Sequence, residues 1–331
     1  MRNKAIALIS GGLDSLLAAR IVKDQGIGVL GVVFIMQFAS RDLEGFKTRV
    51  EEAAGEAGIP VRFVDISGDF LKVLRRPEHG YGANINPCID CKILMLRKAK
   101  KIMQEEGARF VLTGEVLGER PMSQRKAALD IIEKRSGLKG RLLRPLSARL
   151  MKETEPEKEG IVEREKLLDI RGRSREAQLA LAGDYRITKF FSPSGGCLLT
   201  DPVFSRKIED LVRTGTFRKD EISLLKYGRH FRLDGQTKVI VGRNEKENDK
   251  LLELKKRSDM VFRLKDKAGP YALLRGETSR ANIEKAASLV LGHSRYKKKS
   301  GMQVEYWSGG VDIRTIPART INRDKIDKIR I

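Results

Sequence analysis

Cysteine and histidine are both scarce in this chain, which has three of each among its 331 residues. An odd number of cysteines argues against the disulfide framework of a small secreted protein. The chain also lacks an apolar run long enough to cross a membrane. Its N-terminal stretch, MRNKAIALISGG, has only a short apolar segment and no small-residue cleavage site, unlike a signal peptide. We therefore expect a cytoplasmic protein with no membrane partner, whose thiols bind a metal, carry redox chemistry or are simply buried.

Acidic residues are also scarce relative to basic residues. The chain has 66 lysines and arginines against 44 aspartates and glutamates, which gives a formal net charge of +22. The excess is spread along the chain, since residues 201–331 alone carry 31 basic and 18 acidic residues. Such a field favours a polyanion such as nucleic acid without selecting its sequence. A solvated surface that keeps the protein soluble is the alternative interpretation.

The first half of the chain alternates between short apolar runs and helical patterns. The runs that read as strands cover residues 4–10, 28–36, 59–67, 108–114 and 141–148, and the helical patterns cover residues 15–26, 42–58 and 91–107. Strands that alternate with helices predict an α/β domain with a parallel sheet covered on both faces. In such a sheet the ligand site lies at the carboxyl ends of the strands.

The composition changes after this series. Residues 151–166 are mostly charged and read as an exposed loop and helix. Helical patterns over residues 204–215 and 219–228 precede a new run of short strands around a helix. We therefore expect three parts: an α/β domain at 1–200, linker helices at 201–236 and a second, smaller α+β domain at 237–331.

The string SGGLDS, residues 10–15, follows the first predicted strand and begins the first predicted helix. Two adjacent glycines let backbone amides turn toward a phosphate, and the helix N-terminus adds a positive dipole. A carboxylate such as Asp14 repels a phosphate unless a magnesium ion lies between them. The string therefore indicates a metal–nucleotide site, although a plain glycine turn with Asp14 as helix cap is the simpler alternative.

The same string resembles the signature loop of the PP-loop ATP pyrophosphatases, which have an adenine nucleotide alpha hydrolase-like fold and split ATP into AMP and pyrophosphate. It lacks the Gly-Lys-Ser/Thr ending of a Walker loop. The resemblance implies that pyrophosphate and Mg²⁺ bind at Ser10, Gly11, Gly12, Asp14 and Ser15. It also implies that residues 34–37, with Phe34 at their start, lie by the adenine.

Two further stretches resemble tRNA-thiolating families. TGEVLG at residues 113–118, which includes Gly114, and the later LRPL at residues 143–146 are similar to segments of tRNA 4-thiouridine synthetases. NPCIDC, with Cys88 and Cys91, is similar to the motif of the tRNA 2-thiouridylases. The resemblance implies an ATP-dependent tRNA sulfurtransferase that adenylates a uridine oxygen and replaces it with sulfur, with Asp14, Cys88 and Cys197 as catalytic residues.

Four interpretations of Cys88, Cys91 and Cys197 stay open. Two of the thiols could relay a persulfide, or all three could hold a 4Fe-4S cluster with one open iron. They could bind zinc with His79 as fourth ligand, or lie buried as free thiols. We favour the cluster, because it uses all three cysteines and because Gly195 and Gly196 allow the backbone to approach it. The sulfur donor would be free sulfide or a persulfide from a cysteine desulfurase.

Residues 238–331 resemble the NFACT-R domain, a module associated with RNA. Arg243 and the run Arg295-Tyr296-Lys297-Lys298-Lys299 combine basic and aromatic side chains, which suits backbone contacts and base stacking. We expect this module to stand in for the RNA-binding domain that precedes the loop in 4-thiouridine synthetases. A loop with Arg120, Arg125 and Lys126 would contact the same tRNA near the active site.

Two other functions remain as alternatives. One is a PP-loop ligase that adenylates another substrate and uses its cysteines for zinc. The other is a ribosome-associated RNA-binding factor that depends on the C-terminal module alone. The oligomeric state also stays open, with a homodimer as one option.

Overall fold

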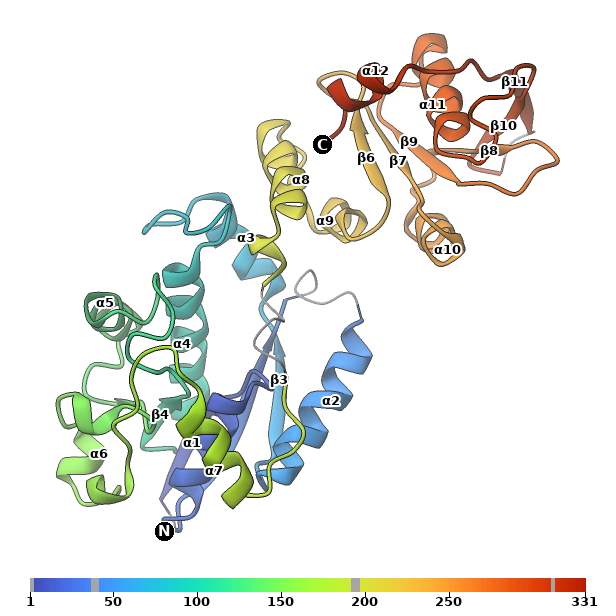
Figure 1. Ribbon diagram of the computed structural model, residues 1–331. Helices are drawn as coiled ribbons and strands as arrows, with labels where there is room; N and C mark the ends of the chain where they lie inside the picture. The colour runs from blue at the N-terminus through green and yellow to red at the C-terminus, as the bar shows by residue number, and fades with distance from the viewer. Residues whose placement is uncertain (1–2, 37–41, 192–196, 311–312) are drawn as a thin grey trace. The chain divides into compact units, whose positions relative to one another are not determined.

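The computed structural model describes residues 3–36, 42–191, 197–310 and 313–331 (Figure 1). The chain divides into two compact units, Met1–Thr200 and Asp201–Ile331. No helix in the described ranges is both long enough and apolar enough to cross a membrane.

The N-terminal unit is built on a parallel sheet of five strands, which confirms the expected α/β class. The strand order is β3-β2-β1-β4-β5. The strands are β1 (Lys4–Leu8), β2 (Gly28–Ile35), β3 (Val61–Asp65), β4 (Phe110–Thr113) and β5 (Leu142–Leu143). The central strands are almost continuously apolar because helices cover both of their faces.

Helices cover this sheet in two layers (Figure 1). One apolar cluster joins a sheet face to α1 (Leu13–Lys23), α2 (Leu43–Glu56) and α7 (Glu176–Asp184). A second cluster joins the other face to α4 (Cys88–Glu105) and α5 (Lys126–Ser136). A further helix, α3 (Ser67–Arg75), contacts α4. The two layers therefore bring α1 and α4 to opposite faces of the same strands.

The strand order creates a switch point beside β1. The chain runs outward from β1 through β2 to β3 and then crosses to β4 on the other side of β1. A crevice opens where the order reverses, outside the carboxyl ends of the two strands. The loops that follow β1 and β4 carry SGGLDS and TGE, so both motifs lie at this crevice.

The charged segment at 151–166 is more buried than we expected. It contains α6 (Glu155–Lys158) and η2 (Arg164–Lys166), after η1 (Ala148–Leu150). Pro156 and Val162 are almost fully buried, and Val162 belongs to the cluster on the α1 face. Its apolar residues therefore fix the segment to the domain, and the Glu157 side chain is buried with them in an ion pair with Arg164.

The C-terminal unit is a smaller α+β domain, as expected. Its antiparallel sheet has the order β11-β10-β8-β9-β7-β6. The strands are β6 (Arg229–Arg232), β7 (Lys238–Val241), β8 (Met260–Leu264), β9 (Ala272–Arg275), β10 (Gln303–Ser308) and β11 (Arg314–Pro317). The helices are α8 (Pro202–Arg213), α9 (Lys219–Leu225), α10 (Glu245–Leu254), α11 (Arg280–Gly292) and α12 (Arg323–Lys328).

Side chains that alternate along these strands form two apolar layers. Val239 and Val241 point to the cluster that includes α11, whereas Ile240 joins Leu224 of α9 and Leu251 of α10. The segment 201–236, which we expected to be linker helices, thus contributes one helix to the second layer. It also contributes the edge strand β6. Buried Lys207 ties α8 to this layer by donating to the carbonyl oxygens of Leu225 and Gly228 at 2.9 and 3.2 Å.

Candidate active site

The turn between β1 and α1 is held by its own serines and glycines. Ser15 Oγ donates to the carbonyl oxygen of Gly12 at 2.8 Å and accepts from the backbone amide of Ser10 at 3.2 Å. Gly11 has a φ of +78°, and a Cβ there would lie 2.6 Å from the Phe191 ring. Glycine is therefore required at position 11. Because a helix N-terminus leaves its first amides without partners inside the helix, this turn presents donors to an anion.

The loop after β4 contacts this turn directly. A Cβ at Gly114 would overlap the carbonyl carbon of Asp14 and the amide nitrogen of Ser15. Two motifs separated by a hundred residues are therefore in van der Waals contact. The structure places Gly114, a residue expected to bind the cofactor, against the SGGLDS turn, which we call the phosphate loop.

Asp14 lies in the first turn of α1 with one carboxylate oxygen unsatisfied. Its Oδ1 is buried and accepts no hydrogen bond from any described residue. Burial raises the pKa of Asp14, and nearby Arg175, Gln178 and Arg120 oppose the increase. A buried carboxylate oxygen without a donor suits a cation, since Mg²⁺ prefers oxygen ligands.

The three cysteines come together from distant parts of the chain, and none forms a disulfide. Cys88 and Cys91 lie in the first turn of α4, and Cys197 begins a short turn, η3 (Leu198–Thr200). The pKa of Cys91 is raised to about 12, mainly by burial and also by the neighbouring thiols of Cys197 and Cys88. Burial also raises the pKa of Cys197, with Cys88 adding to the effect. The three thiols therefore lie within electrostatic reach of one another.

The turn that carries Cys197 is attached to the loop before α4. Asn84 Nδ2 donates to the carbonyl oxygen of Thr200 at 2.8 Å. Within the turn, Thr200 Oγ1 donates to the carbonyl oxygen of Cys197 at 2.7 Å. Gly195 and Gly196, which we expected to approach a cluster, lie outside the described residues.

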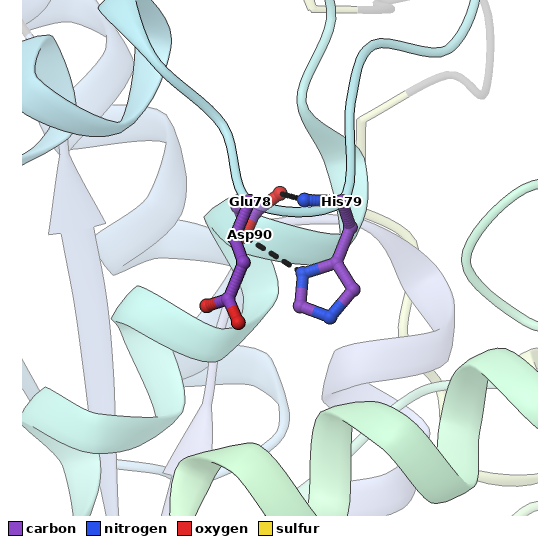
Figure 2. A group of neighbouring side chains, drawn as sticks. All are labelled: Glu78, His79 and Asp90. Carbon is purple, nitrogen blue, oxygen red and sulfur yellow. Dashed lines mark hydrogen bonds and ion pairs between the residues drawn. The ribbon is translucent and has the colours of Figure 1, made fainter.

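His79, the candidate fourth ligand in the zinc alternative, is bonded to a carboxylate (Figure 2). Asp90, between the two cysteines of α4, accepts from the backbone amide of His79 at 2.9 Å, and its other oxygen lies 2.9 Å from His79 Nδ1. Glu78 completes this group and is paired with Arg135. These bonds satisfy the carboxylates and fix the loop at 78–87 to the start of α4.

The three cysteine sulfur atoms are also too far apart for a preformed zinc site. Zn–S bonds of about 2.3 Å in tetrahedral geometry place sulfurs roughly 3.8 Å apart. Among the described residues, which include Cys88, Cys91 and Cys197, the three Sγ atoms do not all lie within 4.8 Å of one another. The spacing therefore disfavours zinc in this arrangement.

Two cations connect the cysteines with the phosphate loop. Arg120 lowers the pKa of Cys88 and also that of Asp14, in each case against the larger effect of burial. Lys92 follows Cys91 in sequence and lowers the pKa of both Cys88 and Cys91. Its Nζ lies 3.6 Å from Oε1 of the buried Glu115, in the TGE motif. The phosphate loop and the thiols thus lie within electrostatic reach of the same cation, Arg120.

Glu115 is the centre of a buried ion network that the sequence did not reveal. Arg144, in the LRPL stretch, donates to Glu115 at 3.1 Å and to Glu133 at 3.0 Å, and Arg144 and Glu115 are almost inaccessible to solvent. Burial would raise the pKa of Glu115, but Lys92 and Arg144 more than offset it and leave the pKa lowered. An ion pair between Arg144 and Glu115 therefore joins the two motifs that are similar to 4-thiouridine synthetases.

Three other described residues that we expected at the site are Phe34, Arg125 and Lys126. Phe34 is near the carboxyl end of β2, half-buried against the cluster on the α4 face, and Gln37 lies outside the described residues. Arg125 and Lys126 are exposed, but Lys126 is the first residue of α5 rather than part of a loop, and it pairs with Asp130 at 3.2 Å.

The C-terminal unit contains a cavity of about 810 Å³ that is lined by both basic and acidic side chains, the acidic ones being Glu245, Asp249, Asp266 and Glu305. Arg229, Arg243, Arg263 and Arg295 are among its lining residues. Arg243 is neutralised by Glu247 at 2.6 Å. Arg229 is half-buried and has no ion pair with any described residue. Burial lowers its pKa, and neighbouring Arg243 and Arg330 lower it further, while Glu247 opposes them.

A basic and aromatic group lies beside this cavity, in the run 295–299. Arg295 lies over the Tyr296 ring at 5.0 Å, and Lys299 Nζ lies 5.6 Å from the same ring. Lys297 and Lys298 are exposed. The run therefore places Arg295 and Lys299 at one aromatic ring and adds two exposed lysines, the combination that we expected to contact RNA.

The comparisons with known proteins agree with the sequence motifs. Residues 228–330 match the family model described as the NFACT protein RNA binding domain. A tRNA-specific 2-thiouridylase MnmA of Pelobacter propionicus is 30% identical over 118 residues, which cover 34% of this chain and 33% of that protein. A probable tRNA sulfurtransferase of Thermococcus kodakarensis is 28% identical over 123 residues, which cover 36% and 31%. The chain thus spans about a third of the length of these relatives.

A solved 4-thiouridine synthetase in complex with RNA and ATP is 26% identical, with 43% of this chain and 36% of that chain covered and a TM-score of 0.36. The family model described as "Thiamine biosynthesis protein (ThiI)" matches residues 1–166, half of the chain. The expected family is therefore confirmed: the chain belongs to the ThiI family.

Proposed function

We propose that this protein is an ATP-dependent tRNA sulfurtransferase that thiolates a uridine in the cytoplasm. The observation that carries the proposal is the position of Arg120, whose charge acts on both Asp14 of the phosphate loop and the Cys88 thiol. A nucleotide at the loop and sulfur at the thiols would therefore meet in one site. The 2-thiouridylase and the probable tRNA sulfurtransferase named above support the same reaction.

The phosphate loop would bind the triphosphate of ATP. Backbone donors at the start of α1 would bind the pyrophosphate part, and Asp14 would hold Mg²⁺ through its unsatisfied oxygen. The magnesium ion would neutralise phosphate charge. In the first step, a uridine carbonyl oxygen attacks the α-phosphorus, the bond to the β-phosphate oxygen breaks and pyrophosphate leaves. The protein's role in this step is positioning and charge stabilisation.

Sulfur would be delivered from the thiols near Arg120. In the second step a sulfur nucleophile attacks the activated ring carbon, the carbon–oxygen bond breaks and AMP leaves with the oxygen. Arg120 and Lys92 lie beside Cys88 and would stabilise negative charge on the incoming sulfur. The first turn of α4, where Cys88 and Cys91 lie, adds the positive end of a helix dipole.

The thiols fit a 4Fe-4S cluster better than they fit zinc. Their sulfurs lie farther apart than tetrahedral zinc requires, whereas cluster ligands bind different irons. A cluster bound through Cys88, Cys91 and Cys197 would supply one iron without a protein ligand, at which sulfide can bind. The high pKa of Cys91 points the same way, since a buried neutral thiol is a poor persulfide nucleophile until a metal displaces its proton.

The C-terminal unit would bind the tRNA. Its cavity contains Arg229, which forms no ion pair with a described residue, and the run 295–299 adds the exposed cations Arg295 and Lys299 at the Tyr296 ring. Phosphates of an RNA backbone would supply the missing negative charge. The match of residues 228–330 to an RNA binding domain supports this assignment.

The decisive experiment is metal and sulfide analysis of protein purified without oxygen, followed by a thiolation assay with tRNA, ATP and sulfide. We expect about four irons and four sulfides per chain with a broad absorption band near 400 nm, as for a 4Fe-4S cluster. Cys91→Ala should remove both the band and thiolation, while Asp14→Ala should keep the band and abolish adenylation. An iron-free protein that thiolates tRNA only with a cysteine desulfurase would support the persulfide relay instead. Stoichiometric zinc without thiolation would refute the proposal.

A further inference from the structure

Helix α7 brings two polar side chains to the phosphate loop that no motif identified. Arg175 is the N-cap residue of α7, and Gln178 lies in its first turn. The helix packs against α1, which begins with the phosphate loop. Both residues lie beyond position 166, where the family match ends.

Gln178 is fully buried, yet neither atom of its amide group makes a hydrogen bond of good geometry with a described residue. The Nε of Arg175 and the Oδ1 of Asp14 are also buried and unsatisfied. The Gln178 side chain nevertheless faces the Asp14 carboxylate within hydrogen-bonding reach and lowers the pKa of that group. Buried polar groups are nearly always paired with protein, water or ligand. Unsatisfied groups on both helices therefore indicate a polar ligand between them.

The backbone before α7 fixes these side chains in place. Gly172 donates its amide to the carbonyl oxygen of Leu117 at 2.8 Å, and Leu117 and Arg171 form a parallel bridge. A Cβ at Gly118 would lie 3.6 Å from the Gly172 amide nitrogen. The segment 171–175 is thus attached to the loop that contains Gly114, and the position of Arg175 follows from this attachment.

The charges around these groups identify the kind of ligand. The Glu119 carboxylate lies within electrostatic reach of the Asp14 carboxylate and of the Arg120 and Arg175 guanidinium groups. The site thus contains two carboxylates as well as two guanidinium groups. A free anion would be repelled by the carboxylates, and a free cation by the arginines. A metal-bound polyphosphate matches both sets of charges.

We propose that Arg175 and Gln178 complete the nucleotide site by binding the β- and γ-phosphates of Mg-ATP. The Arg175 guanidinium binds the pyrophosphate that leaves, and the Gln178 amide nitrogen donates to a phosphate oxygen beside the metal on Asp14. This inference rests on the proposed function, since it requires ATP at the phosphate loop. It adds that the nucleotide site extends beyond the residues covered by the family match.

The test compares ATP and AMP binding by calorimetry, with Mg²⁺ and without tRNA, in three variants. Gln178→Leu and Arg175→Ala should weaken ATP binding about 10- to 100-fold, the usual effect of losing a hydrogen bond to a charged group. AMP affinity should change less than about threefold, because AMP lacks the β- and γ-phosphates. Arg173→Ala is the matched control, since Arg173 is exposed on the same segment, and it should bind ATP like the wild type.

Melting temperature without ligand supplies a second readout. Gln178→Leu removes two unsatisfied buried atoms at similar volume, so the ligand-free protein should melt at the same or a higher temperature than the wild type. Equal loss of ATP and AMP affinity, or ATP binding like the wild type in both variants, would overturn the inference while leaving the proposed function intact. A wild-type protein that binds no ATP would overturn both. If Arg175→Ala does not fold, Arg175→Gln provides the same comparison.

Discussion

Gly114 of the β4 loop packs directly against the backbone of Asp14 in the phosphate loop, with no room for a side chain between them. This contact joins two sequence motifs at the switch point of the sheet. The position of the Asp14 carboxylate therefore depends on a residue a hundred positions away.

We expect Gly114→Ala to destabilise the protein by about 1–3 kcal/mol, as overpacking of a close contact does. It should also weaken ATP binding, because Asp14 must move to make room. Urea unfolding and ATP titration measure the two effects. Gly183→Ala in α7 is the control, since no atom lies within 4 Å of its Cβ position and alanine favours the helix. Unchanged ATP affinity in Gly114→Ala would show that the contact does not position Asp14.

Arg144→Met should destabilise the N-terminal unit by about 3–5 kcal/mol, because it leaves the buried Glu115 without its main partner. Arg141→Ala removes an exposed ion pair with Glu155 at 2.7 Å and should cost less than about 1 kcal/mol. Chemical denaturation of both variants gives the comparison. Similar losses in the two variants would contradict the assignment of a buried network.

The same network predicts how stability changes in acid. The folded pKa of Glu115 lies below its ordinary value of 4.5, so the unfolded chain binds the proton more readily. Glu115 therefore contributes stability that is present above pH 4.5 and is lost as the pH falls through the folded pKa. Unfolding curves between pH 3 and 7 should show this loss in the wild type. A wild-type stability that stays level below pH 4.5 would argue against it.

Cys91 should react slowly with iodoacetamide in the native, metal-free protein. Alkylation requires the thiolate, and raising the pKa from 9.0 to about 12 leaves roughly a thousandfold less thiolate at pH 8. Mass spectrometry after timed labelling, in buffer and in urea, would measure the rates. Native labelling as fast as labelling in urea would show that Cys91 is neither buried nor shielded.

Arg229→Ala should weaken RNA binding while leaving the C-terminal unit at least as stable, because it removes a half-buried cation without a counterion. The slope of log affinity against log salt should fall by about one, as for the loss of one phosphate contact. Filter binding with tRNA at several salt concentrations tests this. Arg280→Ala on α11, whose side chain is 91% exposed, is the control. An unchanged slope in Arg229→Ala would remove Arg229 from the RNA interface.

The local structural features of this protein can be predicted from its sequence. The apolar runs of β1, β2 and β4 identify strands, because burial on both faces leaves no polar alternation. SGGLDS identifies the phosphate loop, because glycine conformation and helix polarity act within a few residues. NPCIDC likewise brings Cys88 and Cys91 together, since both fall in one helical turn.

Only the tertiary structure decided which distant residues meet. The crossover from β3 to β4 places Gly114 on Asp14, and Arg144 of the LRPL stretch becomes the partner of Glu115. Gln178 has no sequence signal, because a polar residue in a short helix usually faces solvent and is buried here by packing of α7 against α1. Such contacts depend on strand order and helix docking, which short-range patterns do not specify. The sequence alone thus determined the chemistry that the site contains, and the fold determined which side chains take part in it.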